Sequence, residues 1–204
     1  MNVKLNELKG RYVQIVPMER NHIKEMYDIG QKEEIWRYLP VKIKTQKEMA
    51  KFVENALANK ETGEEFPFVL LDCNEKVIGT TRFMDISNIN RSLEIGWTWL
   101  TPDVWGTPVN IECKYLLLKY CFEHMKCIRV QLKTDELNLR SQKAIERIGG
   151  VREGILRNHM IRKDGSYRNS VIYSVIENDW GVVKLKLEDM LEQKNIEHRF
   201  EKTD

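Results

Sequence analysis

Residues 93–123 read LEIGWTWLTPDVWGTPVNIECKYLLLKYCFE, and this stretch decides the fold. It begins with an extended apolar segment, Leu93–Leu100, passes through a turn of small and polar residues, and continues as a helix predicted over Pro108–Met125. A strand that turns into a helix aims free backbone N–H groups and the positive end of the helix dipole at one point. Such a point suits a pyrophosphate, although the same pattern is more often only a connection between two elements.

Three residues of the turn fit an anion-binding loop. Gly106 would let the backbone come close to a ligand, and Thr107 would add a hydroxyl group. Pro108 fits the first helical turn, where its missing N–H is tolerated. The turn is therefore a candidate ligand loop.

Strands and helices are predicted on both sides of this stretch. The other predicted strands are Arg11–Val16, Phe66–Leu71, Val77–Asp85, Cys127–Leu132, Ile155–Arg162 and Ser170–Ile176. The predicted helices are Met18–Ile29, Gln46–Lys60, Leu139–Ile148 and Asn178–Lys194, with an aromatic-rich connection at Ile35–Ile43.

Short connections between the central strands favour an antiparallel meander, and Asp164-Gly165 is a strong hairpin signal. The order of elements predicts an α/β (α+β) fold, a mixed sheet with helices packed against it. No repeat or linker is evident, so residues 1–204 are expected to form a single domain. A charged C-terminal helix and tail begins at about residue 179, and Glu188–Asp204 is expected to fray.

Composition narrows the class of protein. Hydrophobic residues make up 42% of the 204 residues and charged residues 31%, which is typical of a globular chain. A net charge of +2 gives no reason to expect nucleic-acid binding. The four cysteines lack metal-ligand spacing, so reduced thiols and no metal site are expected. With no signal peptide or apolar span recognised, a cytoplasmic location without membrane contact is expected.

A second informative stretch is Thr134–Gly150, TDELNLRSQKAIERIGG. Asn138 stands just before a short helix, where an N-cap is the simplest interpretation, and Ser141 falls in the first turn. Arg140 and Lys143 would be either solvated or in contact with anionic groups.

Taken together, the stretches resemble the GNAT superfamily of acetyltransferases. The resemblance covers about Leu8 to Trp180 and is closest to the branch of ribosomal-protein N-terminal acetyltransferases of RimJ/RimL type. Its carriers are LKGRYVQIVPMERNH, the stretch quoted first, and NLRSQKAIERIGGVREGILRNHMIRKDGSYRNSVIYSVIENDW.

The resemblance implies a fold and a reaction. The fold is a mixed, mainly antiparallel sheet of about seven strands that opens as a V, here between Leu93–Leu100 and Ile128–Leu132. The pantetheine arm of acetyl-coenzyme A (acetyl-CoA) would lie in this opening and pair with strand backbone. The reaction is direct transfer of an acetyl group to a primary amine within a ternary complex.

The resemblance also implies the residues that contact acetyl-CoA. The phosphate loop corresponds to Trp105, Gly106, Thr107, Pro108, Val109 and Asn110. The edge of the V corresponds to Trp97, Thr98, Trp99 and Leu100. From the second stretch, the expected contacts are Asn138, Arg140, Ser141 and Lys143.

Two residues are expected to move protons. Glu94 is the candidate base, against the alternative of a half-solvated surface carboxylate. Strand alternation predicts that its face of the strand holds Glu94, Gly96 and Thr98, opposite Leu93, Ile95, Trp97 and Trp99. Ser141 aligns with a serine of the RimL-like branch and is the candidate donor to the leaving thiolate.

Two departures from the family pattern leave an alternative open. Pro108 replaces a usual glycine and removes a phosphate donor, and Ile145 replaces a tyrosine that serves many relatives as an acid. The alternative is a non-catalytic regulator or pseudoenzyme that binds acyl-CoA.

The acceptor is the least specified partner. Trp36, Tyr38 and Arg82 are candidates for its binding site, although aromatic side chains more often pack in a core. Arg82, Arg162 and Arg168 could favour an acidic acceptor, although a solvated strand residue is the simpler interpretation of each. An α-amine, with a pKa of about 8, is roughly a tenth neutral at pH 7, which mildly favours protein N-termini over lysine. Small-molecule amines stay open, as does a homodimer of the kind that relatives form.

Overall fold

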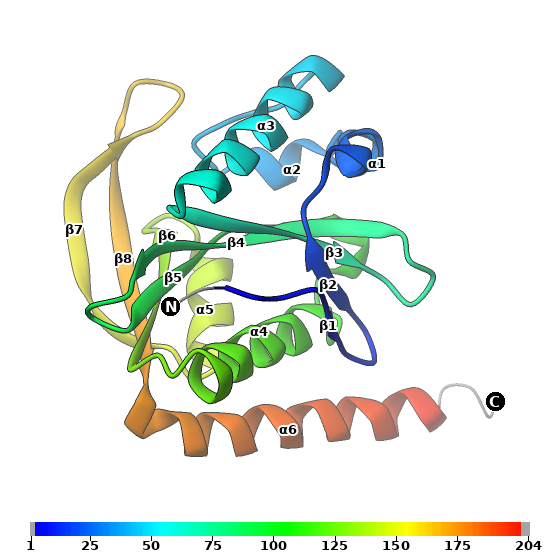
Figure 1. The fold of residues 1–204 in the computed structure, drawn as a ribbon, viewed down its shortest axis with the longest axis vertical. Coiled ribbons are helices and arrows are strands. Elements are labelled where there is room, and N and C mark those ends of the chain that lie inside the picture. The colour runs from blue at the N-terminus through cyan, green and yellow to red at the C-terminus, as the bar shows by residue number, and fades with distance from the viewer. Residues whose placement is uncertain (1–2, 201–204) are drawn as a thin grey trace.

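In the computed structural model of the protein, an eight-stranded sheet with the order β1-β2-β3-β4-β5-β6-β8-β7 forms the centre of the molecule (Figure 1). Residues 3–200 are described, with only the backbone given for 195–200. All neighbouring strands are antiparallel except β5 and β6. The strands are β1 Leu8–Lys9, β2 Gln14–Pro17, β3 Glu65–Leu71, β4 Val77–Ser87, β5 Ser92–Leu100, β6 Arg129–Asp135, β7 Val151–Ile161 and β8 Tyr167–Ile176.

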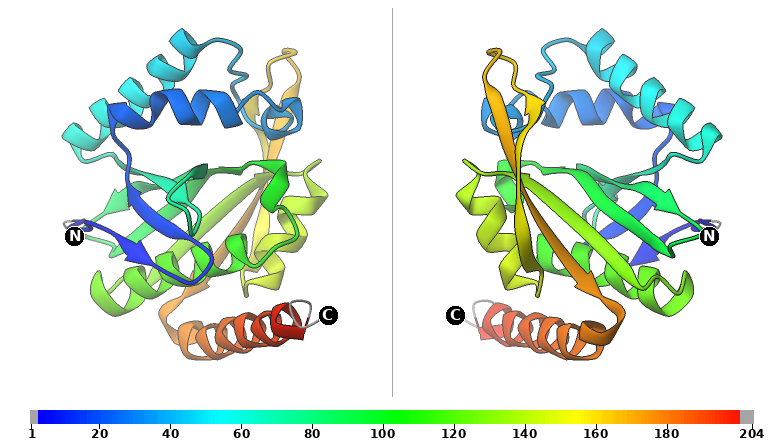
Figure 2. Two further views of the ribbon diagram at one scale, coloured as in Figure 1. Left: turned by 90° about the vertical axis from the view of Figure 1, so that its right-hand side faces the viewer. Right: turned by 90° about the vertical axis from the view of Figure 1, so that its left-hand side faces the viewer.

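Helices cover both faces of this sheet (Figure 2). One face carries η1 Arg20–His22, α1 Ile23–Ile29, α2 Glu33–Trp36 and α3 Gln46–Thr62. The other carries α4 Val109–Lys119, the π-helical η3 Tyr120–His124, α5 Leu139–Arg147 and α6 Glu177–Phe200, while η2 Pro102–Val104 follows β5. The predicted mixed, mainly antiparallel sheet flanked by helices is confirmed, with eight strands in place of about seven.

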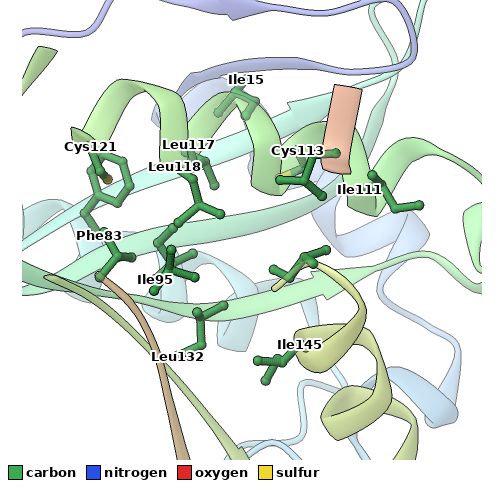
Figure 3. Packing of buried hydrophobic residues seen from close by; sticks show 14 of the residues in the cluster. Ile15, Phe83, Ile95, Ile111, Cys113, Leu117, Leu118, Cys121, Leu132 and Ile145 are labelled. Atoms are coloured by element: carbon green, nitrogen blue, oxygen red, sulfur yellow. The ribbon is translucent and has the colours of Figure 1, made fainter. Parts of the chain in front are cut away.

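Each face of the sheet has its own buried apolar cluster. On the α4 face, Phe83, Ile95 and Leu132 from the sheet pack with Leu118 of α4 and Ile145 of α5 (Figure 3). On the α1–α3 face, the buried cluster includes Trp36, Met26, Val53 and Trp99. These clusters show on which face each strand residue lies.

The V-shaped opening lies between β5 and β6. The two strands pair only at Ser92↔Arg129, Leu93↔Val130 and Glu94↔Gln131. Beyond these pairs β5 continues to Leu100 and β6 to Asp135 without any pairing between them. The edges of the two strands that face this gap are therefore free to bind a ligand.

A bulge in β5 changes which side chains share a face. Trp97 has a φ of 49°, and the register with β4 shifts between Thr80↔Trp99 and Arg82↔Gly96. The prediction that Glu94 and Thr98 share a face is therefore wrong. Thr98 points to α4, whereas Glu94 lies between two residues of the α4-side core and so points to the α1–α3 face. The extra residue at the bulge inverts the alternation.

Several local predictions are confirmed. Thr45 and Glu48 form the capping box of α3, because each side chain accepts a hydrogen bond from the other residue's backbone N–H. Asn138 caps α5, and Gly149 follows that helix with a φ of 94°. At the turn between β7 and β8, Gly165 has a φ of 83°.

Other local predictions need correction. The short helix α2 occupies the start of the Ile35–Ile43 connection, and the predicted Pro108–Met125 helix is α-helical only to Lys119 before its π-helical turn. α6 is helical as far as Phe200, so the segment from Glu188 that is expected to fray belongs to this helix, while residues 201–204 lie outside the described part. Cys113, Cys121 and Cys127 are buried free thiols as expected, but Cys73 is exposed. None of the helices described is long and apolar enough to cross a membrane.

Glu112 of α4 attaches the N-terminal segment to this core. Its carboxylate is buried and accepts hydrogen bonds from the backbone N–H groups of Arg11 (2.8 Å), Tyr12 (2.6 Å) and Val13 (2.9 Å). A Cβ at Gly10 would lie 2.3 Å from this carboxylate, so only glycine fits there. Buried, charge-assisted hydrogen bonds of this kind are the stronger class in proteins.

We expect Glu112→Gln to lower the free energy of unfolding by about 1.5–3 kcal/mol, since the amide cannot accept all three N–H groups. Urea unfolding would measure the loss. Glu64→Gln, at an exposed residue, is the control and should change stability little. Equal stability of both variants would show that the carboxylate does not hold this segment.

Candidate active site

A cavity of about 340 Å³ lies in the V between β5 and β6. Its wall also includes the loop after β5, one side of α4, the start of α5, the end of α2 and parts of β7 and β8. The predicted site residues in this wall are Tyr38, Glu94, Trp97, Thr98, Trp99, Leu100, Trp105, Gly106, Asn110, Asn138, Arg140 and Ser141. Outside it lie Trp36, Arg82, Thr107, Pro108, Val109 and Lys143.

The loop before α4 and the first turn of that helix hold unused hydrogen-bond donors, and two of the residues concerned, Gly106 and Asn110, lie in the cavity wall. Gly106 has a φ of 78°, and a Cβ there would meet nothing within 4 Å, so the backbone conformation rather than space calls for glycine. Within the described part of the chain, the N–H groups of Gly106, Asn110 and Ile111 have no acceptor. Three free amides at the positive end of a helix dipole form a suitable place for a phosphate.

The other loop residues have local structural roles. Pro108 is the N-cap of α4, so the donors at Asn110 and Ile111 remain. The hydroxyl of Thr107 donates to the carbonyl of Val104 at 2.7 Å and accepts weakly from the N–H of Val109 at 3.4 Å. The hydroxyl proton predicted for a phosphate is thus engaged within the loop.

The start of α5 contacts the loop directly. The guanidinium of Arg140 lies 3.5 Å from the centre of the Trp105 ring, whose Nε1 donates to the carbonyl of Leu100 at 2.9 Å. Asn138 uses its side-chain oxygen to cap the helix through the N–H of Ser141 at 3.1 Å. The two stretches singled out in the sequence therefore form opposite walls of one cavity.

Glu94 stands where the V begins, in the last residue pair shared by β5 and β6. Its side chain is only 3% exposed, so it is not a half-solvated surface carboxylate. Oε2 accepts a hydrogen bond from Gln131 at 2.8 Å and forms an ion pair with Lys133 at 3.1 Å. A Cβ at Gly96 would come within 3.0 Å of Oε1, so glycine leaves that oxygen accessible.

The sequence matches the family model described as an acetyltransferase (GNAT) domain over residues 13–151. The chain belongs to the GNAT family of acetyltransferases. A crystal structure of a putative acetyltransferase from T. thermophilus superposes with a TM-score of 0.85 at 33% identity, covering 94% of this chain and 100% of that one.

Two Bacillus subtilis (strain 168) proteins are also similar. The uncharacterized N-acetyltransferase YnaD is 25% identical over 156 residues, which cover 76% of this chain and 88% of YnaD. The putative ribosomal N-acetyltransferase YdaF is 28% identical over 102 residues, 50% of this chain and 55% of YdaF. This GNAT protein is therefore an acyltransferase enzyme, and its family uses acetyl-CoA in general.

Lys114 is a cavity residue of this GNAT domain that the sequence analysis missed. It is 5% exposed, and its Nζ donates to the hydroxyl of Thr98 at 2.8 Å, which in turn is 2.7 Å from the hydroxyl of Thr81. No carboxylate pairs with it in the described chain, and burial lowers its pKa. Its spacing from Ile111 and Leu118 on the buried side of the helix was a readable signal.

Two of the candidate acceptor residues are part of the core. Trp36 is 1% exposed, donates its Nε1 to the carbonyl of Gly30 at 2.7 Å and packs against Trp99. Arg82 is paired with Glu65 at 2.7 Å behind the Trp97 ring, away from the cavity wall. Direct contact of Trp36 or Arg82 with an acceptor would need rearrangement, whereas Tyr38 lies in the wall.

Two buried thiols of the GNAT domain, Cys113 and Cys121, are poor nucleophiles. Burial raises the pKa of Cys113 to about 11 and raises that of Cys121 as well. A thiolate, not a thiol, attacks a thioester, so these residues fit direct transfer better than a route through an acetyl-cysteine.

We expect Lys114→Met to weaken coenzyme A binding roughly tenfold or more, because a buried cation without a carboxylate partner is suited to an anionic or carbonyl-bearing ligand. Titration calorimetry with coenzyme A would measure this. Lys119→Met, on the same helix but outside the cavity wall, should bind normally. Equal affinities in the two variants would remove Lys114 from the ligand site.

The same variant has a pH signature. Because the folded-state pKa of Lys114 lies below the ordinary lysine pKa of about 10.4, the folded protein binds fewer protons at this residue than the unfolded chain. Stability of the wild type should therefore rise as the pH approaches 10.4, and Lys114→Met should lack this contribution. Urea unfolding across alkaline pH would compare the two slopes.

Proposed function

We propose that this GNAT enzyme transfers an acetyl group from acetyl-CoA to a primary amine by direct attack within a ternary complex. One observation carries the proposal: the same V-shaped cavity adjoins the free amides at the start of α4 and the carboxylate of Glu94. The first can bind the thioester's carrier and the second can receive the proton of the amine.

Acetyl-CoA fits the donors that the cavity offers. The pyrophosphate would accept hydrogen bonds from the N–H groups of Gly106, Asn110 and Ile111, where the structure leaves them unused. The pantetheine arm would follow the unpaired edge of Trp97–Leu100, in the manner of an added strand. Arg140 is also in the wall, and Lys143 is exposed nearby on α5.

Glu94 is the proposed base. The amine nitrogen would attack the thioester carbonyl carbon, and its proton would pass to Oε1 of Glu94, directly or through a water molecule. Oε1 is the available oxygen, because Gln131 and Lys133 engage Oε2. As the C–S bond breaks, Ser141 would donate its hydroxyl proton to the leaving thiolate and regain a proton from solvent, while Glu94 would release the proton of the amine to solvent.

The acceptor class follows from the modest strength of such a base. An α-amine needs far less help than a lysine, whose pKa is about 10.4, so a protein N-terminus or a small amine of similar pKa is favoured. The similarity to YdaF, whose name describes a ribosomal N-acetyltransferase, supports the RimJ/RimL-like branch.

The alternative, a non-catalytic acyl-CoA-binding protein, makes a different prediction. Titration calorimetry with acetyl-CoA, together with an assay for release of the coenzyme A thiol over a panel of α-amines and small amines, separates the two. Binding with thiol release supports the transferase, whereas binding without release on any amine supports the alternative. Absence of binding would contradict both.

We expect Glu94→Gln to lower kcat roughly 100- to 10,000-fold while leaving acetyl-CoA affinity nearly unchanged, because the amide keeps the shape of the side chain but cannot take a proton. Glu34→Gln is the matched control, since Glu34 is another carboxylate of the same wall. A large loss in the Glu34 variant but not in the Glu94 variant would assign the base to Glu34 instead.

We expect Ser141→Ala to lower kcat by about 100-fold at the low end of general acid catalysis, with little change in the KM for the amine. A matched change, Ser166→Ala in the β7–β8 turn, should leave kcat unaltered. If Ser141→Ala were equally active, the thiolate would have to be protonated by solvent or another group.

The remaining predictions concern surroundings and assembly. A homodimer is proposed at the edge strand β7, where Val151, Ile155, Leu156 and Ile161 are exposed. Light scattering of the protein in solution would test it. A cytoplasmic location and the expectation of no nucleic-acid or membrane partner stay predictions from the sequence.

A further inference from the structure

Arg168 of β8 is a buried cation with unused hydrogen-bonding capacity. It is 9% exposed, and its Nε is buried without an acceptor among the residues described. Its one ion-pair contact there is with Oδ2 of Asp135, at 3.9 Å, which is too long for a hydrogen bond. A buried N–H group without an acceptor destabilises the folded protein, so the unused donors of Arg168 need an explanation.

The carboxylates near Arg168 are already held by other groups. Asp135 receives Nε and Nη2 of Arg162, each at 2.8 Å, and the N–H of Leu137 at 2.9 Å. In Glu94, the same oxygen, Oε2, accepts a hydrogen bond from Gln131 and forms the ion pair with Lys133. Neither carboxylate is therefore committed to Arg168.

The carboxylates around this point are engaged by other cations. Lys133 pairs with Glu94, and Arg162 pairs with Asp135 and also feels the charges of Glu136 and Asp164, so among the residues described Arg168 has no carboxylate within hydrogen-bond distance. His159 is close by and hydrogen-bonded to Ser170, and burial together with these cations lowers its pKa, which keeps it neutral near pH 7. A carboxylate oxygen from a ligand would give the guanidinium of Arg168 the acceptor that it lacks.

Strand alternation places Arg168 on the same face of the sheet as Glu94, the proposed base. Val171, Tyr173 and Val175 of β8 lie in the α4-side core, so Arg168, which has the opposite parity, points to the α1–α3 face. By the same alternation Lys133 and Asp135 share that face, as does Glu94. The free amides of the α4 loop belong to the other face, so the unused donors of Arg168 are not explained by the pyrophosphate.

Arg168 also lies where the acceptor would enter. It is in the wall of the main cavity and of a neighbouring cavity of about 130 Å³, which share Tyr38, Pro40 and Met160. Arg37 and Lys163 line this neighbouring cavity, which we call the outer cavity. Nζ of Lys163 donates to the carbonyl of Trp36 at 2.6 Å and so joins the β7–β8 turn to the end of α2. A molecule reaching Glu94 through the outer cavity would pass the guanidinium.

We propose that Arg168 binds a carboxylate of the acceptor, and that the preferred acceptors are therefore amines that carry a carboxylate close to the amino group. The inference rests on the proposed acetyltransferase function and names its substrate class. The carboxylate can belong to a small amino acid or to an acidic side chain beside a peptide N-terminus. Arg168 would position the acceptor, with the amine directed to the thioester and Glu94.

Two pairs of probes test this, each differing by one charge. They are aspartic acid α-amide against asparagine α-amide, both of which present an α-amine, and the peptide amide Ala-Asp-Ala-Ala against Ala-Asn-Ala-Ala. We expect kcat/KM to favour the carboxylate member of at least one pair by roughly 10- to 100-fold, as a buried charge-assisted hydrogen bond allows. The pair that shows the preference identifies the source of the carboxylate. No preference in either pair would overturn the inference.

Variants of Arg168 assign the effect. Arg168→Gln should reduce the preference to within about twofold, and Arg168→Lys should keep part of it because the charge remains. Arg157→Gln, at an exposed residue of β7, is the control for charge in general. A purely structural role would lower activity on both members of a pair equally and leave their ratio unchanged, which would contradict the proposal.

A binding measurement separates this inference from the proposed function. Calorimetry with the coenzyme A-loaded protein would compare the same probe pairs without turnover. If the carboxylate member binds preferentially but no amine causes thiol release, the anion site stands and the transferase proposal fails. If thiol is released with equal kcat/KM for both members, the transferase stands and Arg168 has no such role.

Discussion

The parallel pairing of β5 and β6 ends after three residue pairs, and the proposed function depends on this early end. A parallel pair that continued to Leu100 would satisfy both strand edges and leave no room for a ligand. The bulge at Trp97 accompanies the separation, since the extra residue increases the local twist of β5. Strand ends that diverge in this way expose backbone groups inside the protein, where a ligand rather than bulk water can satisfy them.

The bulge also directs the side chains before and after it to opposite faces of the sheet. Before it, Glu94 points to the α1–α3 face, and after it, Thr98 points to α4 and contacts Lys114. Without the inversion, the candidate base and the threonine would compete for one face. In the proposed mechanism, one irregular residue thus lets a single strand contact the thioester's carrier on one side and the acceptor on the other.

Much of the fold and part of the site could be predicted from the sequence because their signals are local. The cap at Asn138 and the loop at Gly106 act through their own backbone neighbourhood, and each appears where expected. The bulge could not be predicted, because WTW continues an alternating pattern and only pairing with β4 reveals the extra residue. Lys114 carries no motif, and the sequence could not separate Arg168 from Arg82 and Arg162 as a residue for an acidic acceptor. The structure separates them, because Arg82 and Arg162 have close carboxylate partners and Arg168 has none within hydrogen-bond distance in the described chain.

In the proposed mechanism, the immediate surroundings of Glu94 would fix the direction of proton transfer. Gln131 and Lys133 both hold Oε2, so the carboxylate cannot rotate freely to exchange its two oxygens. Oε1 is left facing the space above Gly96, where any larger residue would collide with Met84 and crowd the carboxylate. An amine that uses this base must therefore approach over Gly96, on the face where Arg168 also lies, which restricts both the orientation of the acceptor and the position of any charge that it carries.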